Sequence, residues 1–196
     1  MTNKIKVAII GAGYMAAEHI RAFRDISGVQ VCGIFSRTPE RAEKLAADHQ
    51  IQHVCHSIDD LHKKTNADLL VVAVPELVTK DVCLRAFLYP WQCLIEKPVG
   101  YNYEQASLIM DAAESSNRKA YVALNRRHYS STRAVIDDAN TFPAKRLVHV
   151  YDQENPLIAL ESGWPNLVVK NWHYANSIHL LDYFQVLCRG DLLSVE

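Results

Sequence analysis

The amino-acid sequence predicts an α/β fold, with a doubly wound parallel sheet over residues 1–123 and an incomplete second α/β domain over residues 124–196. Apolar runs typical of strands alternate with helical spacing through residues 4–124. Several runs, such as Val7–Ile10, are apolar on both faces, which is typical of parallel strands covered by helices on both sides. A glycine-containing turn also lies directly between the first strand and the first helix. Such alternation predicts βαβ units with right-handed crossovers.

The amino-acid composition disfavours several classes of protein. The 196 residues include 21 basic and 22 acidic side chains, so no charge surplus favours binding to nucleic acid or an anionic membrane. The longest apolar stretch, Leu69–Pro75, is far shorter than the roughly 20 residues of a membrane span, and the N-terminus shows no secretory signal. The five cysteines contain no CxxC pair, which favours reduced thiols. We therefore expect a globular, cytoplasmic protein.

Strands are expected wherever a short apolar or β-rich run is bounded by polar or turn residues. Asp68–Val74 is the most apolar of these runs and is expected near the middle of the sheet. The expected strands are Lys4–Ile10, Val29–Phe35, His53–Cys55, Asp68–Val74, Trp91–Glu96 and Lys119–Leu124.

Capping residues indicate where the helices between these strands begin. Thr38 supplies a capping hydroxyl before a proline at the first helical position. Ser57 with Asp60, and Asn102 with Gln105, have the three-residue spacing of a capping box. The expected helices are Tyr14–Ile26, one from Pro39 through Ala46, a brief one after Ser57, Val78–Leu88, and one from Asn102 through Ser116.

The regular alternation stops at Asn125. Ser130–Ala139 and Ala175–Cys188 have helical spacing, and Arg146–Tyr151 has the pattern of a strand. Prolines interrupt the chain between these elements. The roughly 70 residues of this part lie near the lower end of domain size, so the second domain is expected to be incomplete.

The turn after the first strand has the spacing G-x-G-x-x-A, from Gly11 to Ala16. In a dinucleotide-binding (Rossmann) domain, the glycine at position 11 permits the tight turn, and Gly13 lets the backbone approach a pyrophosphate. The amides of Tyr14 and Met15 then stand at the helix N-terminus, where a phosphate is favoured. The motif therefore predicts dinucleotide binding; the alternative is a purely structural turn.

The end of the second strand distinguishes NAD from NADP. An acidic residue there would bond the ribose 2′-hydroxyl of NAD. This chain has Ser36 and Arg37 instead, with no carboxylate, and both side chains can bind a 2′-phosphate. We predict NADP as the cofactor, with NAD as the alternative.

Motifs beyond the loop resemble the glucose–fructose oxidoreductase/inositol dehydrogenase (Gfo/Idh/MocA) family. A strand ends in Glu96-Lys97-Pro98, and Pro75 follows another strand where that family has a proline turn beside the nicotinamide ribose. His179 and Asp182 resemble the family's H-x-x-D helix. The resemblance covers about the first 125 residues well and is weaker beyond them.

The resemblance implies an NAD(P)-dependent oxidoreductase that moves a hydride between nicotinamide and a sugar, nucleotide sugar or polyol. It implies that Lys97 bonds the reacting oxygen and that His179 acts as acid or base, with Pro75 and Glu96 near the cofactor. Pro98 is a position at which a cis peptide bond would shape the turn. Asp182, on the same helix face as His179, either orients the imidazole or forms a structural pair with it. The alternative function is a dinucleotide-binding, catalytically impaired or regulatory member of the same family.

Three departures from the family pattern bear on activity. Ala175 stands where the family often has an aspartate, Thr79 stands where it has a histidine, and the chain ends at Glu196 whereas family members continue further. We therefore expect a truncated member that binds dinucleotide but turns over substrate poorly. Unpaired strand edges and exposed apolar surface predict a homo-oligomer.

Two other clusters carry weaker signals. The spacing of His49, His53, Cys55 and His56 crosses a helix end and a strand, which does not suit a metal site, so no metal is expected. Aromatic residues before the last helix are consistent either with a sugar pocket or with core packing; they are Trp164, Trp172, His173 and Tyr174.

Overall fold

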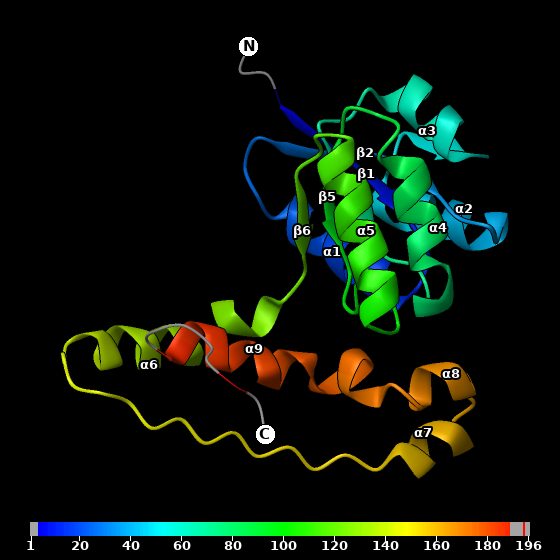
Figure 1. Cartoon of the computed structure of the whole chain (residues 1–196). Helices are drawn as coiled ribbons and strands as arrows, with labels where there is room; N and C mark the ends of the chain where they lie inside the picture. The colour runs from blue at the N-terminus through cyan, green and yellow to red at the C-terminus, as the bar shows by residue number, and fades with distance from the viewer. Residues whose placement is uncertain (1–3, 189–193, 195–196) are drawn as a thin grey trace. The chain divides into compact units, whose positions relative to one another are not determined.

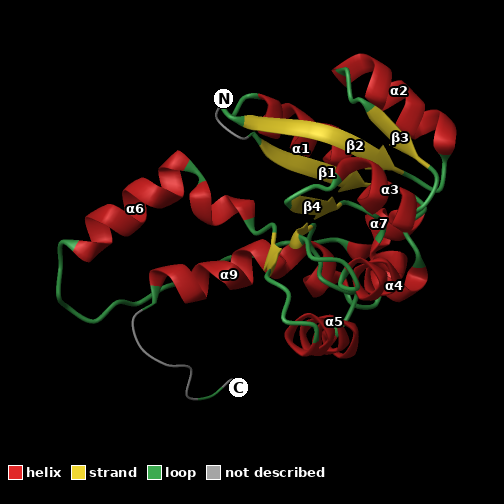
Figure 2. Cartoon of the chain, turned by 90° about the horizontal axis from the view of Figure 1, so that it is seen from above, coloured by secondary structure: helices red, strands yellow, loops and turns green. Residues whose placement is uncertain are grey.

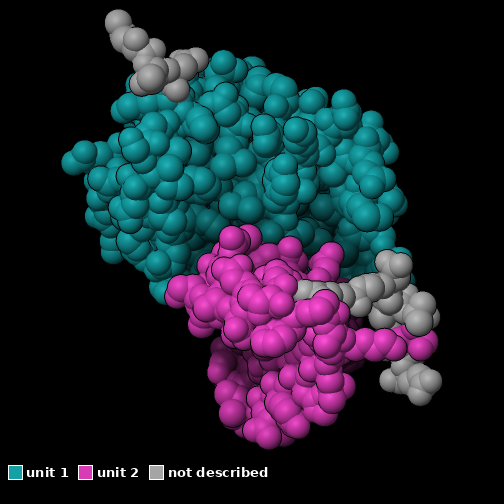
Figure 3. All heavy atoms as spheres, turned by 90° about the vertical axis from the view of Figure 1, so that its left-hand side faces the viewer, with its two compact units in different colours: residues 1–123 teal, residues 124–196 magenta. Residues whose placement is uncertain are grey.

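A computed structural model describes residues 4–188 and residue 194 of the chain (Figure 1). The chain divides into two compact units, residues 1–123 and residues 124–196 (Figure 3).

The first unit is built on a six-stranded parallel sheet with the strand order β3-β2-β1-β4-β5-β6 (Figure 2). The predicted doubly wound sheet is therefore confirmed, and its order reverses between β1 and β4, as in dinucleotide-binding domains. The strands are β1 (Ile5–Ile10), β2 (Val29–Phe35), β3 (His53–Cys55), β4 (Leu69–Val72), β5 (Gln92–Ile95) and β6 (Ala120–Val122).

Helices connect these strands and cover both faces of the sheet. They are α1 (Tyr14–Arg24), α2 (Pro39–His49), α3 (Ile58–Thr65), α4 (Glu76–Ala86) and α5 (Tyr103–Ser115). The predicted caps of α3 and α5 are present, because Ser57 accepts from the Asp60 amide at 2.9 Å and Asn102 from the Gln105 amide at 3.0 Å. The Thr38 side chain forms no capping hydrogen bond with α2, so of the two predicted start signals only the proline at the first helical position, Pro39, applies.

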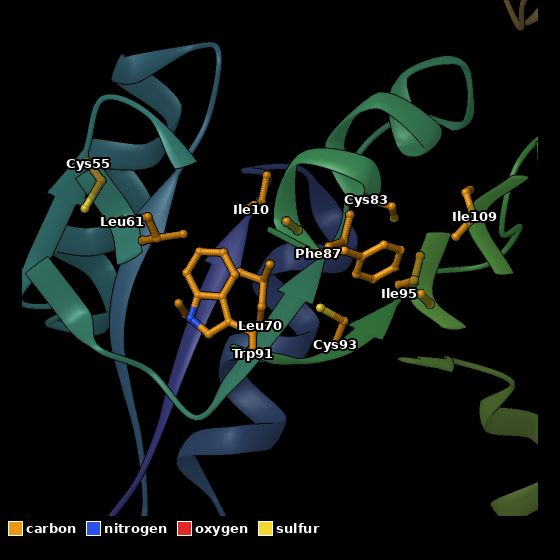
Figure 4. Close-up of a cluster of buried hydrophobic side chains, with 14 residues drawn as sticks. Ile10, Cys55, Leu61, Leu70, Cys83, Phe87, Trp91, Cys93, Ile95 and Ile109 are labelled. Carbon is orange, nitrogen blue, oxygen red and sulfur yellow. The ribbon is translucent and has the colours of Figure 1, made fainter. Parts of the chain in front are cut away.

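Alternate residues of each central strand enter two separate cores. Val7 and Ile9 of β1 pack with α1 and α2, whereas Ala8 and Ile10 face the other side. The second core contains Phe87 and Trp91, both almost fully buried, with residues of α3, α4 and α5 (Figure 4). Burial on both faces explains why these strands read as continuous apolar runs.

The described part of the second unit is helical and irregular. Its elements are a 3₁₀ turn at Asn125–His128, α6 (Ser130–Asn140), α7 (Pro156–Glu161), α8 (Asn166–Val169), a π-helical turn at His173–Ser177, and α9 (Ile178–Leu187). A π-helical turn is rare and often occurs at functional sites.

The strand predicted at Arg146–Tyr151 is wrong. This segment has no strand pairing within residues 4–188, and Leu147 and Tyr151 are each 85% exposed. A strand requires a neighbour for its backbone N–H and C=O groups, and alternating sequence cannot supply one. Within the described residues, the α/β character predicted for this unit is thus limited to helices and irregular chain.

Candidate cofactor and catalytic site

Four parallel strands of the first unit end at the same edge of the sheet. Ile10 of β1 is in register with Phe35 of β2 and Val72 of β4, and Val72 is in register with Ile95 of β5. The residues predicted to bind cofactor follow directly after these strand ends. Ligands of open α/β sheets bind beyond the carboxyl ends of the strands, near the point where strand order reverses.

The loop between β1 and α1 contains two glycines with different structural roles. Gly11 has φ +118°, and a Cβ there would lie 2.0 Å from the carbonyl oxygen of Ala73. Gly13, the residue before α1, has φ −92° and ψ −173°, and a Cβ there would meet nothing within 4 Å. The fold therefore requires glycine at position 11 but has room for a side chain at position 13.

The helix α1 begins immediately after this loop. Tyr14 and Met15 form its first turn and are exposed, at 75% and 37% respectively. The first amides of an α-helix have no partner within the helix and carry the positive end of its dipole. This end of α1 is thus suited to an anionic group.

Ser36 and Arg37 follow β2 at the same edge of the sheet. Ser36 Oγ accepts a hydrogen bond from the Thr38 amide at 3.1 Å, which fixes the hydroxyl oxygen while its hydrogen can still be donated. Arg37 is exposed. Both groups are chemically suited to a phosphate, as the sequence indicated.

Pro75 is exposed and directly precedes α4. Its carbonyl accepts hydrogen bonds from the Val78 amide at 3.0 Å and from the Thr79 hydroxyl at 3.3 Å. Thr79, which stands where the related family has a histidine, is 2% exposed and serves here to close the start of α4.

Glu96 and Lys97 lie directly after β5. The Glu96 amide donates to the Val72 carbonyl at 2.8 Å, and the Lys97–Pro98 peptide bond is cis. The Glu96 carboxylate is held by groups of the protein itself: Oε1 lies 2.7 Å from His19 Nε2, and Oε2 accepts from the Lys97 amide at 3.1 Å. Glu96 therefore supports the backbone of Lys97, a role not deduced from its place in the motif.

The second unit contains the other predicted catalytic residue, His179, which is 6% exposed on α9. Asp182, one turn later, binds Arg127: Arg127 Nε donates to Oδ2 at 2.8 Å, and Arg127 Nη2 donates to Oδ1. Arg127 is thus a partner of Asp182 that the H-x-x-D spacing did not indicate. Ala175, where the family often has an aspartate, is buried in the π-helical turn.

The aromatic residues before α9 are arranged around one carboxylate. Glu154 accepts from Trp172 Nε1 at 3.1 Å and from the Asn176 amide group at 2.7 Å. Trp172 also packs edge-on against Trp164, with ring centroids 5.3 Å apart. Within the described residues, no three His, Cys, Asp or Glu side chains are grouped so that they could hold a metal ion.

A sequence profile of an oxidoreductase family with an NAD-binding Rossmann fold, Gfo/Idh/MocA, matches residues 5–124. The chain belongs to this family.

Relatives of known sequence align with all or part of the chain. Inositol 2-dehydrogenases from Pseudarthrobacter chlorophenolicus and Arthrobacter sp. are 31% and 28% identical over 100% of the chain and 58% of their own length. A glucose-6-phosphate 3-dehydrogenase from Bacillus subtilis is 30% identical over 64% of the chain and 35% of its own length. The chain spans about half the length of the curated relatives it matches.

Solved structures show the same fold. An apo scyllo-inositol dehydrogenase from Lactobacillus casei matches 96% of the chain and 56% of its own, with a TM-score of 0.78 and 18% identity. A myo-inositol dehydrogenase from the same organism, in complex with NAD(H) and myo-inositol, matches 70% of the chain and 42% of its own, with a TM-score of 0.65 and 24% identity.

One residue of the candidate site, His19, could not be predicted from the sequence. His19 contacts Glu96 across 77 residues, and no local spacing links the two positions. A histidine on the predicted helix α1 is a weak signal by itself, because a half-buried histidine is common in any domain.

None of the helices in residues 4–188 is long and apolar enough to cross a membrane.

Proposed function

We propose that this chain binds a nicotinamide dinucleotide, with the pyrophosphate at the loop Gly11–Met15. The observation that carries the proposal is the difference between the two glycines: a side chain at Gly11 would collide with Ala73, whereas the fold has open space at Gly13. Glycine at position 13 is then explained by a ligand, because a Cβ there would occupy the space that a closely approaching pyrophosphate needs. The N-terminus of α1 supplies amides and a favourable dipole for the phosphates.

We propose NADP as the preferred cofactor over NAD. Residues 35–38 contain no carboxylate, so nothing there repels a 2′-phosphate. The Arg37 guanidinium can form charge-assisted bonds with this group, and Ser36 can donate its hydroxyl hydrogen. Selectivity by these residues is an electrostatic effect, so it should weaken as ionic strength rises.

In the proposed reaction, the nicotinamide supplies the site that accepts or gives the hydride. Lys97, half-buried after β5, would bond the reacting oxygen of the substrate and hold or release its proton. His179 of the second unit would act as acid or base, since imidazole changes charge near neutral pH. Pro75 and Glu96 would shape the edge of the sheet beside the nicotinamide ribose and Lys97.

The proposed substrate class is a polyhydroxylated ring compound such as a sugar, nucleotide sugar or polyol. The support is the activity for which the relatives are named, since they are inositol 2-dehydrogenases and a glucose-6-phosphate 3-dehydrogenase. Exposed apolar side chains of the second unit, among them Phe142 and Leu147, support self-association of the chain, which we propose as well.

A second function is favoured by two observations on the second unit. Ala175 provides no proton carrier, and Asp182 is already bound by Arg127. A chain that binds dinucleotide without effective turnover, as a catalytically impaired or regulatory member of the family, is therefore the alternative.

Fluorescence titration of the 196-residue chain with NADPH and NADH tests the binding proposal directly. We expect saturable binding of both, tighter for NADPH. Nicotinamide absorbance then follows turnover with a panel of inositols, hexose phosphates and nucleotide sugars. Specific turnover supports the dehydrogenase, binding without turnover supports the alternative, and failure to bind either dinucleotide contradicts both.

A further inference from the structure

The helix that follows the phosphate loop is joined to the strand that carries the candidate catalytic lysine. His19 lies in the second turn of α1, and its Nε2 is 2.7 Å from Glu96 Oε1 at the end of β5. The side chains are 14% and 10% exposed, so solvent competes little for this contact. A carboxylate oxygen accepts hydrogen bonds, and the Nε2–H tautomer of the imidazole is the donor that fits this contact.

The same carboxylate is bonded to the lysine backbone. Glu96 Oε2 accepts from the Lys97 amide at 3.1 Å, while the Glu96 amide is anchored to the sheet through the Val72 carbonyl. Glu96 as a whole is 8% exposed. A buried carboxylate is costly unless hydrogen-bonded, so removal of the His19 donor would favour reorientation of Glu96 toward water.

We propose that His19 is a positioning residue for Lys97, acting through Glu96. This inference rests on the proposed function, in which Lys97 bonds the reacting oxygen. With His19 in place, one carboxylate oxygen is fixed to α1, and the other can hold the Lys97 amide. The backbone from which the lysine side chain extends is thereby fixed to the helix whose N-terminus would bind the pyrophosphate. A small displacement of a reacting group lowers the reaction rate by a large factor, so an arrangement that fixes the backbone of Lys97 favours catalysis.

Amide hydrogen exchange at Lys97, measured by NMR on the ligand-free chain, tests the proposal without requiring turnover. His19→Leu keeps apolar bulk on α1 and removes the donor. We expect the Lys97 amide to exchange about tenfold faster in this variant, as for loss of a hydrogen bond to a charged group. The amide of Glu96, which donates to β4, should change much less. His19→Gln restores a donor of similar reach and should return Lys97 exchange close to the wild-type rate.

Arg21→Ala is the matched control, because Arg21 lies on the same helix and its partner Glu18 is on the protein surface. It should leave exchange at Lys97 unchanged. Unchanged Lys97 exchange in His19→Leu would overturn the proposal. So would equal acceleration of all amides, or failure of His19→Leu to fold while the control folds, since the contact would then be only structural.

The dinucleotide titration separates this proposal from the proposed function. His19→Leu should bind NADPH within about threefold of wild type, because it leaves the loop and the N-terminus of α1 intact. In a form that turns over substrate, kcat should fall while the KM for dinucleotide stays the same, and His19→Gln should recover kcat. A wild-type chain that binds no dinucleotide would contradict the proposed function. The exchange rate of the Lys97 amide would still test the contact between His19 and Glu96, because that measurement needs no ligand.

Discussion

Arg127 and Asp182 join the first turn of the second unit to its last described helix. Two nitrogens of the Arg127 guanidinium donate to the two carboxylate oxygens of Asp182, whose side chain is 3% exposed. Bidentate pairing of this kind fixes orientation as well as distance. Gln185, one turn further along α9, also accepts from Arg127, at 3.4 Å.

Removal of the guanidinium should therefore destabilise the second unit. Arg127→Ala leaves the Asp182 carboxylate buried without its partner, and the expected loss is about 3 kcal/mol of unfolding free energy. Urea unfolding, followed by the fluorescence of Trp164 and Trp172, measures the effect. Arg133→Ala, an exposed arginine of α6, is the matched control and should change stability by less than about 0.5 kcal/mol. Equal effects of the two substitutions would show that the pair contributes nothing specific.

The two glycines of the loop should respond differently to alanine. Gly11→Ala should lower the denaturant midpoint, because it combines φ +118° with a clash against the Ala73 carbonyl. Gly13→Ala should fold with wild-type stability yet bind NADPH at least about tenfold more weakly, since its Cβ meets only the ligand. Denaturant unfolding and fluorescence titration of both variants check this. Unaltered binding by Gly13→Ala would remove the main support for the pyrophosphate site.

Cofactor preference should depend on the charge at position 37. Arg37→Asp replaces a group that attracts a 2′-phosphate by one that repels it and can bond a ribose hydroxyl. We expect NADPH to bind at least about tenfold more weakly and NADH to bind equally well or better. Arg24→Ala, an exposed arginine at the end of α1, is the control. A wild-type chain that binds both cofactors equally, and a variant that does the same, would contradict the prediction.

Replacement of Lys97 should lower the turnover of substrate without weakening the binding of the adenine end of the dinucleotide. Lys97→Ala leaves the phosphate loop and residues 36–37 unchanged, so the affinity for ADP-ribose phosphate should stay within about threefold of wild type. In any form of the protein that turns over substrate, kcat should fall by at least about a hundredfold, as for loss of an acid–base group. Steady-state kinetics and titration measure the two effects. Wild-type turnover in Lys97→Ala would exclude the lysine from the mechanism.

The buried thiols should make the first unit less stable at high pH. Burial raises the pKa of Cys55 to about 11 and that of Cys93 to about 12. An unfolded thiol ionises near pH 8.5, so the unfolded chain loses protons first as pH rises. Each thiol thus contributes stability fully below about pH 8.5 and loses up to about 1.4 kcal/mol per pH unit above it, until the folded thiol ionises.

Urea unfolding at pH 8 and about pH 10 measures this loss. Cys188→Ser is the control, because Cys188 is exposed and its replacement leaves all four buried thiols in place. At neutral pH, a thiol reagent should label Cys188 rapidly and the other four cysteines only on unfolding. Rapid labelling of Cys55 or Cys93 in the folded chain would contradict the burial on which the prediction depends.

The order and type of the elements in the first unit could be predicted from the sequence alone. Runs such as Val7–Ile10 are apolar at every position because both faces of the sheet are covered, and that pattern is visible without a structure. The caps at Ser57 and Asn102, and the loop beginning at Gly11, depend on residues only a few positions apart. Local interactions of this kind can be recognised from the spacing of residues in the sequence, which is why these elements were predicted correctly.

Contacts between residues far apart in the chain became visible only in the folded structure. His19 and Glu96 are 77 residues apart, and Arg127 and Asp182 are 55 apart, so helical or strand spacing could not indicate either pair. The guanidinium of Arg127 offers two strong donors to the Asp182 carboxylate, and the spacing of His179 and Asp182 carries no information about this partner. The predicted strand at Arg146–Tyr151 was wrong for the same reason. Its alternating pattern permits a strand, but a strand forms only where another segment accepts its backbone hydrogen bonds.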